Sequence, residues 1–393
     1  MYGKNALFMT LTDLEKVSAH QYHHSTRDQL RELVYTRSEE AFAAGDSARD
    51  GVVTVAALRR RQRRARATFL AGMGGLPRLN TPLNARGAGT FREKGFRIEK
   101  VIFESRPGTP VTANLYVPDG VTSPRGAVLF LCGHHEQAKH AREYQMVCRH
   151  LVKAGLVVLA QDPVGQGERV SYFEKRLGRT TVNWGTTEHD HAGAQCLPLG
   201  DGIARYFLHD AMRGVDFLRS RPEVDSLRIG VTGNSGGGTQ TSMMMLADPR
   251  IAAAAPGTFI MNRRTYQQTG GAQDAEQIWR GFTKAGFDHE DILLGMCPKP
   301  VCVLAVTSDF FPIEGTRETV RRCRRLWKMA GRTADLELVE DVSTHAYTPV
   351  LAQAAARFFS RHLLGKAVAV DSAAIETLEP RRLWCTRSGQ VRG

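Results

Sequence analysis

The chain has 393 residues, a length that allows two or three domains or one large α/β domain with additions. Hydrophobic residues make up 42 % of it and charged residues 24 %, which excludes a largely disordered chain and favours a globular protein with a sizeable core. The formal net charge is +13, so nucleic acid, an anionic membrane and an acidic substrate are all candidate partners before any motif is considered.

Cysteine usage and the start of the chain bear on the compartment. The seven cysteines form no C-x-x-C pair, and their odd number argues against a zinc ribbon or a complete disulfide framework. Residues 1–16 lack the basic start and continuous apolar run of a signal peptide, and no apolar window is long enough to span a membrane. We therefore predict a cytoplasmic protein without a membrane partner.

The first part of the chain has helical spacing. A capped helix start is expected at residues 12–15 and a second helix over 55–71. Residues 72–89 are rich in Gly, Pro and Asn and predict a linker. Residues 1–90 are thus predicted to form an N-terminal helical extension with its linker.

From residue 96 onward, short β-rich runs alternate with longer stretches of helical spacing. This alternation predicts an α/β fold for residues 91–368, with an eight-stranded, mostly parallel sheet and helices on both faces. The expected strands are 96–104, 111–117, 127–132, 156–161, 229–232, 251–255, 301–306 and 336–339. The expected helices are 138–153, 201–220, 237–247, 315–330 and 349–364.

Three further segments fall outside this alternation. Two stretches, 170–200 and 258–298, are too long for ordinary loops and are predicted to be lids or caps, the second partly helical. Residues 369–393 are rich in arginine and poor in apolar residues. They are predicted to form a frayed basic C-terminal tail.

A strand, the pentapeptide G-x-S-x-G and a helix follow one another at Ser235. This is the context of a nucleophile elbow, in which a serine sits on a strained turn between strand and helix. Gly233 and Gly237 keep Cβ atoms out of that bend. The helix N-terminus then points toward the serine, so the N–H of Gly236 is a candidate oxyanion donor.

A serine nucleophile needs a base and an acid that orients the base. Asp309 follows the predicted strand 301–306, and His345 follows the strand 336–339, so both lie at the carboxyl edge where active sites of open sheets gather. The order Ser235, Asp309, His345 is that of the α/β-hydrolase triad. Glu314 and Asp341 are the alternative acids.

Histidines cluster at two further places. The strand 127–132 ends in His134 and His135, whose backbone N–H groups are candidates for the second oxyanion donor. Their side chains diverge, which disfavours metal binding. The cluster at residues 188–191 resembles a metal site more closely, but we interpret His189 and His191 as substrate-binding residues of a lid. No metal and no cofactor is predicted.

Together these segments resemble the α/β-hydrolase superfamily, and within it the acetyl xylan esterase-like and prolyl-oligopeptidase-like serine hydrolases. The resemblance covers about residues 96–364 and implies Ser235 as nucleophile, His345 as general base and Asp309 as its partner. Cys132-Gly133 stands where many relatives carry His-Gly, and residues 1–90 lie outside the match. The resemblance rests on the motifs at residues 131–139, 161–169, 233–238, 308–315 and 344–347.

The basic residues are interpreted in two ways. The arginine-rich runs 59–66 and 321–325 lie on predicted helices without any nucleic-acid-binding motif, so they are expected to be solvated faces or partners of acidic residues. Nucleic acid is therefore not predicted as a partner. Arg263 and Arg264 lie in the presumed cap, and we hypothesise that they bind an anionic or polyhydroxylated substrate.

These observations predict a serine ester hydrolase that acts through an acyl-enzyme on a small acyl ester of a sugar or secondary metabolite. A peptidase or amidase of the prolyl-oligopeptidase kind is one alternative, although no gating domain is recognisable. Lyase or acyl-transfer chemistry in the same pocket is another, and a binding protein on a hydrolase scaffold a third. The expected partner is a small-molecule ester, and a homo-oligomer is left open.

Overall fold

The computed structural model describes residues 28–78 and 80–391. Within them, nine strands form one sheet in the order β1-β2-β3-β5-β4-β8-β9-β10-β11. The strands are β1 (Arg86–Glu93), β2 (Phe96–Arg106), β3 (Thr109–Pro118), β4 (Arg125–Leu131), β5 (Val157–Gln161), β8 (Val224–Asn234), β9 (Ile251–Gly257), β10 (Val301–Ser308) and β11 (Leu336–Thr344).

The sheet is antiparallel at one end and parallel over the rest. Strands β1, β2 and β3 pair antiparallel with one another, and β3 pairs antiparallel with β5. From β5 through β4, β8, β9 and β10 to β11, all pairs are parallel. The carboxyl ends of β8, β10 and β11 therefore meet at the same edge. All eight predicted strands are present, and the predicted α/β class is confirmed.

The ninth strand, β1, corrects the prediction of a linker over 72–89. It pairs with the outer edge of β2, with a register shift between Gly87 and Gly89. Glycines are common at such bulges and in edge strands, where they weaken the strand signal in the sequence. The glycine-rich composition of this segment therefore concealed an edge strand.

Helices cover both faces of the sheet. Helices α4 (Arg142–Lys153) and α11 (Pro349–Leu364) pack on one face, and α6 (Ala204–Arg219) and α7 (Gly236–Ala247) on the other. In α6, Leu208, Ala211, Val215 and Leu218 recur at helical spacing and are fully buried, which explains how this helix packs. In the described part of the chain, no helix is both long and apolar enough to cross a membrane.

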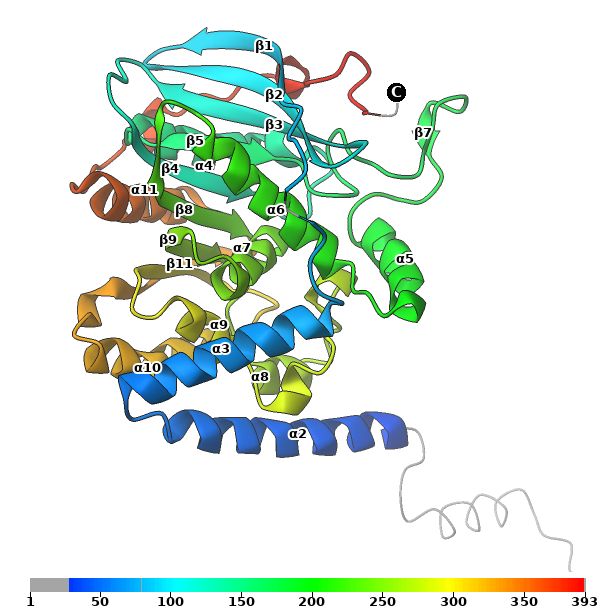
Figure 1. Ribbon diagram of the computed structural model, residues 1–393, viewed down its shortest axis with the longest axis vertical. Helices are drawn as coiled ribbons and strands as arrows, with labels where there is room; N and C mark the ends of the chain where they lie inside the picture. The colour runs from blue at the N-terminus through cyan, green and yellow to red at the C-terminus, as the bar shows by residue number, and fades with distance from the viewer. Residues whose placement is uncertain (1–27, 79, 392–393) are drawn as a thin grey trace, which may run out of the picture.

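Two N-terminal helices, α2 (Gln29–Asp50) and α3 (Val55–Gly72), lie beside α8 (Arg263–Gln268), α9 (His289–Met296) and α10 (Ile313–Met329), far from β1 (Figure 1). We call residues 258–298 the cap. Helix α2 packs closely against it, as shown by Gly45, where a Cβ would lie 2.4 Å from the carbonyl oxygen of Gly286. The predicted helix at 55–71 matches α3. The helix start expected at residues 12–15 lies outside the described residues.

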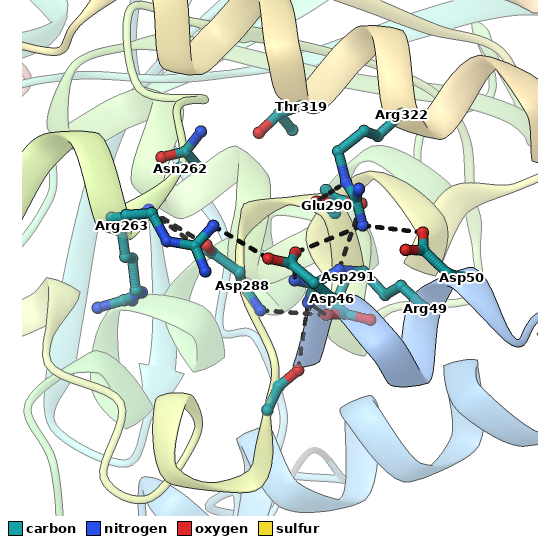
Figure 2. A network of polar contacts seen from close by, with 12 residues as sticks. Asp46, Arg49, Asp50, Asn262, Arg263, Asp288, Glu290, Asp291, Thr319 and Arg322 are labelled. Carbon is teal, nitrogen blue, oxygen red and sulfur yellow. Dashed lines mark hydrogen bonds and ion pairs between the residues drawn. The ribbon is translucent and has the colours of Figure 1, made fainter. Parts of the chain in front are cut away.

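Ion pairs join these N-terminal helices to the cap and to α10 (Figure 2). Arg49 of α2 contacts Asp291 at 2.9 Å and Glu290 at 3.2 Å, and Arg61 of α3 contacts Asp291 at 2.5 Å. Arg322 of α10 contacts Glu290 at 2.8 Å. We call the group of Arg49, Arg61, Glu290, Asp291 and Arg322 the cap network. Some arginines of the arginine-rich runs thus form ion pairs with buried carboxylates instead of facing solvent.

Both long insertions contain regular structure. Residues 170–200 hold the short hairpin β6 (Phe173–Glu174) and β7 (Arg179–Thr180), followed by α5 (Thr186–Cys196). Residues 258–298 hold α8, α9 and the short 3-10 turn η4 (Ala275–Gln277), so the second insertion is partly helical as predicted.

The described part of the C-terminal tail is packed, which corrects the prediction of a frayed terminus. The side-chain oxygens of Glu168 accept hydrogen bonds from the N–H groups of Cys385 (2.8 Å) and Thr386 (2.7 Å), and Leu383 is fully buried. The high arginine content of the tail hid these few anchoring residues.

Candidate active site

Ser235 sits on a sharp turn between β8 and α7. Its φ of 58° and ψ of −118° are strained for a residue with a side chain. A Cβ at Gly233 would lie 2.2 Å from the carbonyl oxygen of Leu131, and one at Gly237 would lie 2.0 Å from the same atom. Only glycine therefore fits two residues before and two residues after the serine, as the sequence motif indicates.

Backbone contacts hold the turn in place. The Ser235 N–H contacts the carbonyl oxygen of Gly257 (3.0 Å) and the hydroxyl of Thr258 (3.1 Å), which itself donates to Asn234 (2.7 Å). Gly236 is the first residue of α7, so its N–H has no acceptor within the helix. That N–H is available to a negatively charged ligand at Ser235.

Asp309 and His345 directly follow β10 and β11, as predicted. His345 Nδ1 lies 2.8 Å from Asp309 Oδ1, and because a carboxylate only accepts, Nδ1 carries the proton. His345 Nε2 is buried and has no hydrogen-bond partner among the described residues. The Phe310 ring packs on the imidazole, with ring centroids 4.3 Å apart. A neutral His345 therefore has a free lone pair on Nε2.

One cavity of about 830 Å³ brings the three residues together. Its walls include an aromatic side, formed by Tyr266, Phe310 and Phe311, and polar side chains such as Asp274 and Glu314. His134, Ser235, Asp309 and His345 all line it. Asp309, rather than Asp341, is the acid paired with the histidine. The size is within the range of cavities that bind small molecules.

The loop after β4 lies beside this cavity. The side-chain amide of Gln166 donates to the carbonyl oxygens of Gly133 (2.6 Å) and His135 (3.0 Å) and so fixes the loop. A Cβ at Gly236 would come within 2.9 Å of the His134 ring, which places His134 against the residue after Ser235. His135 does not line the cavity in the described structure, so His134 is the better placed of the two candidates.

Buried charges hold the segment that carries Gln166. Lys139 Nζ contacts Asp162 at 2.7 Å and Glu168 at 2.6 Å, and all three side chains are buried. Burial alone would raise the pKa of Glu168, but Lys139 and the backbone N–H of Cys385 outweigh it and lower that pKa. Asp162 and Glu168 thus fix a loop rather than line the Ser235 cavity.

Behind one wall of the cavity, His189 and Glu276 meet His134; of the three only His134 lines the cavity, so the buried His189 does not have the place expected of a substrate-binding residue. His134 Nε2 lies 2.8 Å from Glu276 Oε1, and His189 Nδ1 lies 3.2 Å from Glu276 Oε2. Burial would raise the pKa of Glu276, but the two histidines outweigh it and lower that pKa. Glu276 lies in η4 of the cap, and no sequence motif marks it as a site residue.

His191 is not part of this group. It is exposed on α5, where its ring packs on Tyr172 and its Nε2 lies 3.2 Å from Gln195 Nε2. The structure therefore does not support a substrate-binding role for His191. Residues 189 and 191 lie on different sides because the segment is a helix, in which residues two apart do not share a face.

The substrate-binding hypothesis for Arg263 and Arg264 also has to be corrected. Neither residue lines the Ser235 cavity in the described structure. Arg264 forms ion pairs with Glu39 (2.9 Å) and Asp46 (3.0 Å) of α2. The backbone N–H of Arg263 contacts Asp288 at 3.2 Å, and its guanidinium lies 5.9 Å from the Trp279 ring. Arg264 thus joins the cap to α2 and Arg263 packs within the cap, and neither side chain faces the Ser235 cavity.

The mostly parallel sheet, the strained Ser235 turn and the Asp309–His345 pair at the carboxyl edge define the class of α/β-hydrolases. The model of the acetyl xylan esterase (AXE1) family matches residues 88–284, about half of the sequence, and the chain therefore belongs to this family. The protein is accordingly a serine ester hydrolase. A search of curated protein sequences found no match.

Similar solved structures agree with this assignment of the fold. A methylesterase has a TM-score of 0.68 at 16 % identity, over 88 % of this chain and 73 % of that chain. A glucuronoyl esterase from Solibacter usitatus has a TM-score of 0.61 at 15 % identity, over 79 % and 94 %. A putative acetyl xylan esterase from Bacteroides fragilis has a TM-score of 0.59 at 17 % identity, over 74 % and 76 %.

Proposed function

We propose that the protein hydrolyses a small acyl ester of a neutral sugar, with Ser235 as nucleophile, His345 as general base and Asp309 as the residue that orients it. The observation that carries the proposal is the pairing of Asp309 with His345 Nδ1 in the cavity that Ser235 lines. In a neutral imidazole this pairing puts the proton on Nδ1 and the lone pair on Nε2, which is the tautomer a general base needs.

The chemistry follows from these positions. His345 Nε2 takes the Ser235 proton as the hydroxyl oxygen attacks the ester carbonyl, and then gives it to the departing alcohol. The Gly236 N–H at the start of α7 stabilises the oxyanion, and a backbone N–H of the loop at His134 is the second donor. Water then attacks the acyl-enzyme with His345 again as base.

The charge of the cavity favours a neutral substrate. Among the described residues that line it, none is lysine or arginine, whereas Asp274 and Glu314 contribute carboxylates. A polyanionic sugar chain would be repelled by these groups. The polar walls suit sugar hydroxyl groups, and the aromatic side suits the apolar face of a sugar ring. An acetylated neutral sugar thus fits better than an ester of an acidic polysaccharide.

Covalent labelling tests the nucleophile. We expect a fluorophosphonate to add to Ser235 of the wild-type protein, as shown by peptide mass spectrometry, and not to label Ser235→Ala. Ser308→Ala is the matched control, because this serine ends β10 next to Asp309 and should leave labelling unchanged. An unlabelled Ser235 in folded wild-type protein would count decisively against the proposal.

Product analysis tests the substrate class. We expect acetate release from acetylated xylo-oligosaccharides, with incorporation of ¹⁸O from labelled water into the acetate. Methyl-esterified oligogalacturonides should be poor substrates. Preference for the charged substrate would contradict the conclusion that the cavity favours a neutral sugar. Transfer of the acyl group to an acceptor other than water would show that the reaction is acyl transfer instead of hydrolysis.

A further inference from the structure

The group of His134, His189 and Glu276 has the composition and spacing of a metal-binding site. Each residue offers one ligand atom, and these atoms all lie within 4.8 Å of one another. Two nitrogen ligands bonded to a divalent metal at about 2.1 Å lie roughly 3 to 3.5 Å from a neighbouring carboxylate ligand. The observed contacts of 2.8 and 3.2 Å to Glu276 are close to that separation.

The contacts in this group are short but do not form normal hydrogen bonds. Both carboxylate oxygens of Glu276 and Nδ1 of His189 are buried without a hydrogen-bond partner among the described residues. Glu276 is only 1 % exposed, and an unpartnered buried carboxylate is costly. A cation held between the three side chains would satisfy all of these atoms together.

The tautomer of His189 points to the same conclusion. Its Nε2 lies 2.9 Å from the carbonyl oxygen of Val164, which can only accept, so Nε2 carries the proton. Nδ1 is then the nitrogen that faces Glu276, and it is the atom that would bind a metal ion placed between the two side chains.

The outer contacts also match those of metal-bound histidines, which usually have a carbonyl or carboxylate at their second nitrogen. The carbonyl of Val164 serves His189 in this way. At His134 the nearest such group is Asp274, whose Oδ2 lies 3.8 Å from Nδ1, beyond hydrogen-bond distance. The Phe207 ring packs edge-on against His189, with ring centroids 4.8 Å apart, and further fixes the imidazole.

We propose that His134, His189 and Glu276 form a binding site for a divalent transition-metal ion, of the Zn²⁺ class, in the wall of the Ser235 cavity. Two imidazole nitrogens and one carboxylate are a ligand set that suits zinc and leaves a coordination position open. Of the three ligands only His134 lines the cavity, so the ion would lie behind this wall and hold His134 in place. The site extends the proposed function but does not depend on it.

Metal binding can be measured without an activity assay. Protein stripped with a chelator is titrated with Co²⁺, and the visible absorption of the bound ion is recorded. Zn²⁺ content after gel filtration is measured by mass spectrometry. We expect about one metal ion per chain in the wild type, and a loss of at least about tenfold in affinity for Glu276→Gln and for His189→Gln.

His191→Gln is the matched control, because His191 lies on the same helix but outside the group. We expect this variant to bind metal like the wild type. Folding of each variant is checked by circular dichroism, and the thermal shift of the wild type on Co²⁺ addition is an independent readout. The proposal is overturned if folded wild-type protein binds no Co²⁺, or if His191→Gln loses binding as fully as His189→Gln.

Discussion

Two buried polar regions of this molecule differ in what their charges do. In the cap network, Arg49, Arg61 and Arg322 face the carboxylates of Glu290 and Asp291 at 2.5 to 3.2 Å. At the Ser235 site and behind it, His345 Nε2 and both oxygens of Glu276 are buried without hydrogen-bond partners among the described residues. Ion pairs with full hydrogen bonding fix one element against another, whereas buried polar atoms without a hydrogen bond are available to bind a ligand or move a proton.

The largest effect is expected from Ser235→Ala. Loss of the nucleophile should lower kcat by about 10⁶-fold, whereas the melting temperature should stay near that of the wild type. Ester hydrolysis and thermal unfolding are the two measurements. A variant that keeps more than about a tenth of the wild-type kcat would show that another residue is the nucleophile.

Asp309→Asn should come next, with kcat lower by about 10⁴-fold, because an amide can donate to His345 Nδ1 and so favour the wrong tautomer. Asp341→Asn is the matched control, since Asp341 also lies at the end of the sheet but does not line the cavity. Equal losses in the two variants would remove Asp309 from its proposed role.

In the cap network the expected loss is of stability. Arg49→Met leaves buried Asp291 and Glu290 with fewer cations and should lower the free energy of unfolding by about 3 to 5 kcal/mol. Arg31→Met on the same helix breaks an exposed pair with Asp28 and should cost less than about 1 kcal/mol. Urea denaturation measures the free energy of unfolding of both variants. Similar losses in the two would contradict the conclusion that the buried ion pairs stabilise the fold more than the exposed pair does.

Glu168→Gln tests the buried charges beneath the cavity loop, with an expected loss of about 3 kcal/mol at neutral pH. The folded protein lowers the pKa of Glu168 below its ordinary value of 4.5, so its contribution is present above that value. The contribution is lost as the pH falls through the lower folded pKa. Stability of the variant should therefore depend less on pH below about 5. Glu136→Gln, an exposed change nearby, should leave the acid profile unchanged.

The smallest effect is expected for Arg264→Ala. Its ion pairs with Glu39 and Asp46 are partly exposed, so stability should change by about 1 kcal/mol or less. KM should remain unchanged, because the side chain does not line the Ser235 cavity. A clear rise in KM would restore the substrate-binding hypothesis for this residue.

The sequence predicted those parts of the protein that depend on local pattern. The eight strands and five helices of the hydrolase region follow from hydrophobic periodicity, and Ser235, Asp309 and His345 follow from their places after strands. The division of the chain into three parts, its oligomeric state and its cytoplasmic location stay predictions.

Contacts between residues far apart in the chain could not be predicted from the sequence. Glu276 meets His134 and His189 only through the folded cap, 142 and 87 residues away along the chain. Arg264 lies in the cap, as expected, but its charge is neutralised by carboxylates of α2 that no spacing rule connects to it. The sequence alone does not show which residue will pair with a given charged side chain. The role of that side chain depends on the distant segment that folds against it.

The C-terminal anchor at Glu168 has a consequence for the order of synthesis. Cys385 and Thr386, whose N–H groups bind Glu168, leave the ribosome after every strand of the sheet. Glu168 belongs to the same loop as Gln166, which holds the segment of Gly133 and His135. A nascent chain that already carries Ser235, Asp309 and His345 therefore still lacks the last contacts of the loop beside them until residues 385 and 386 have been added.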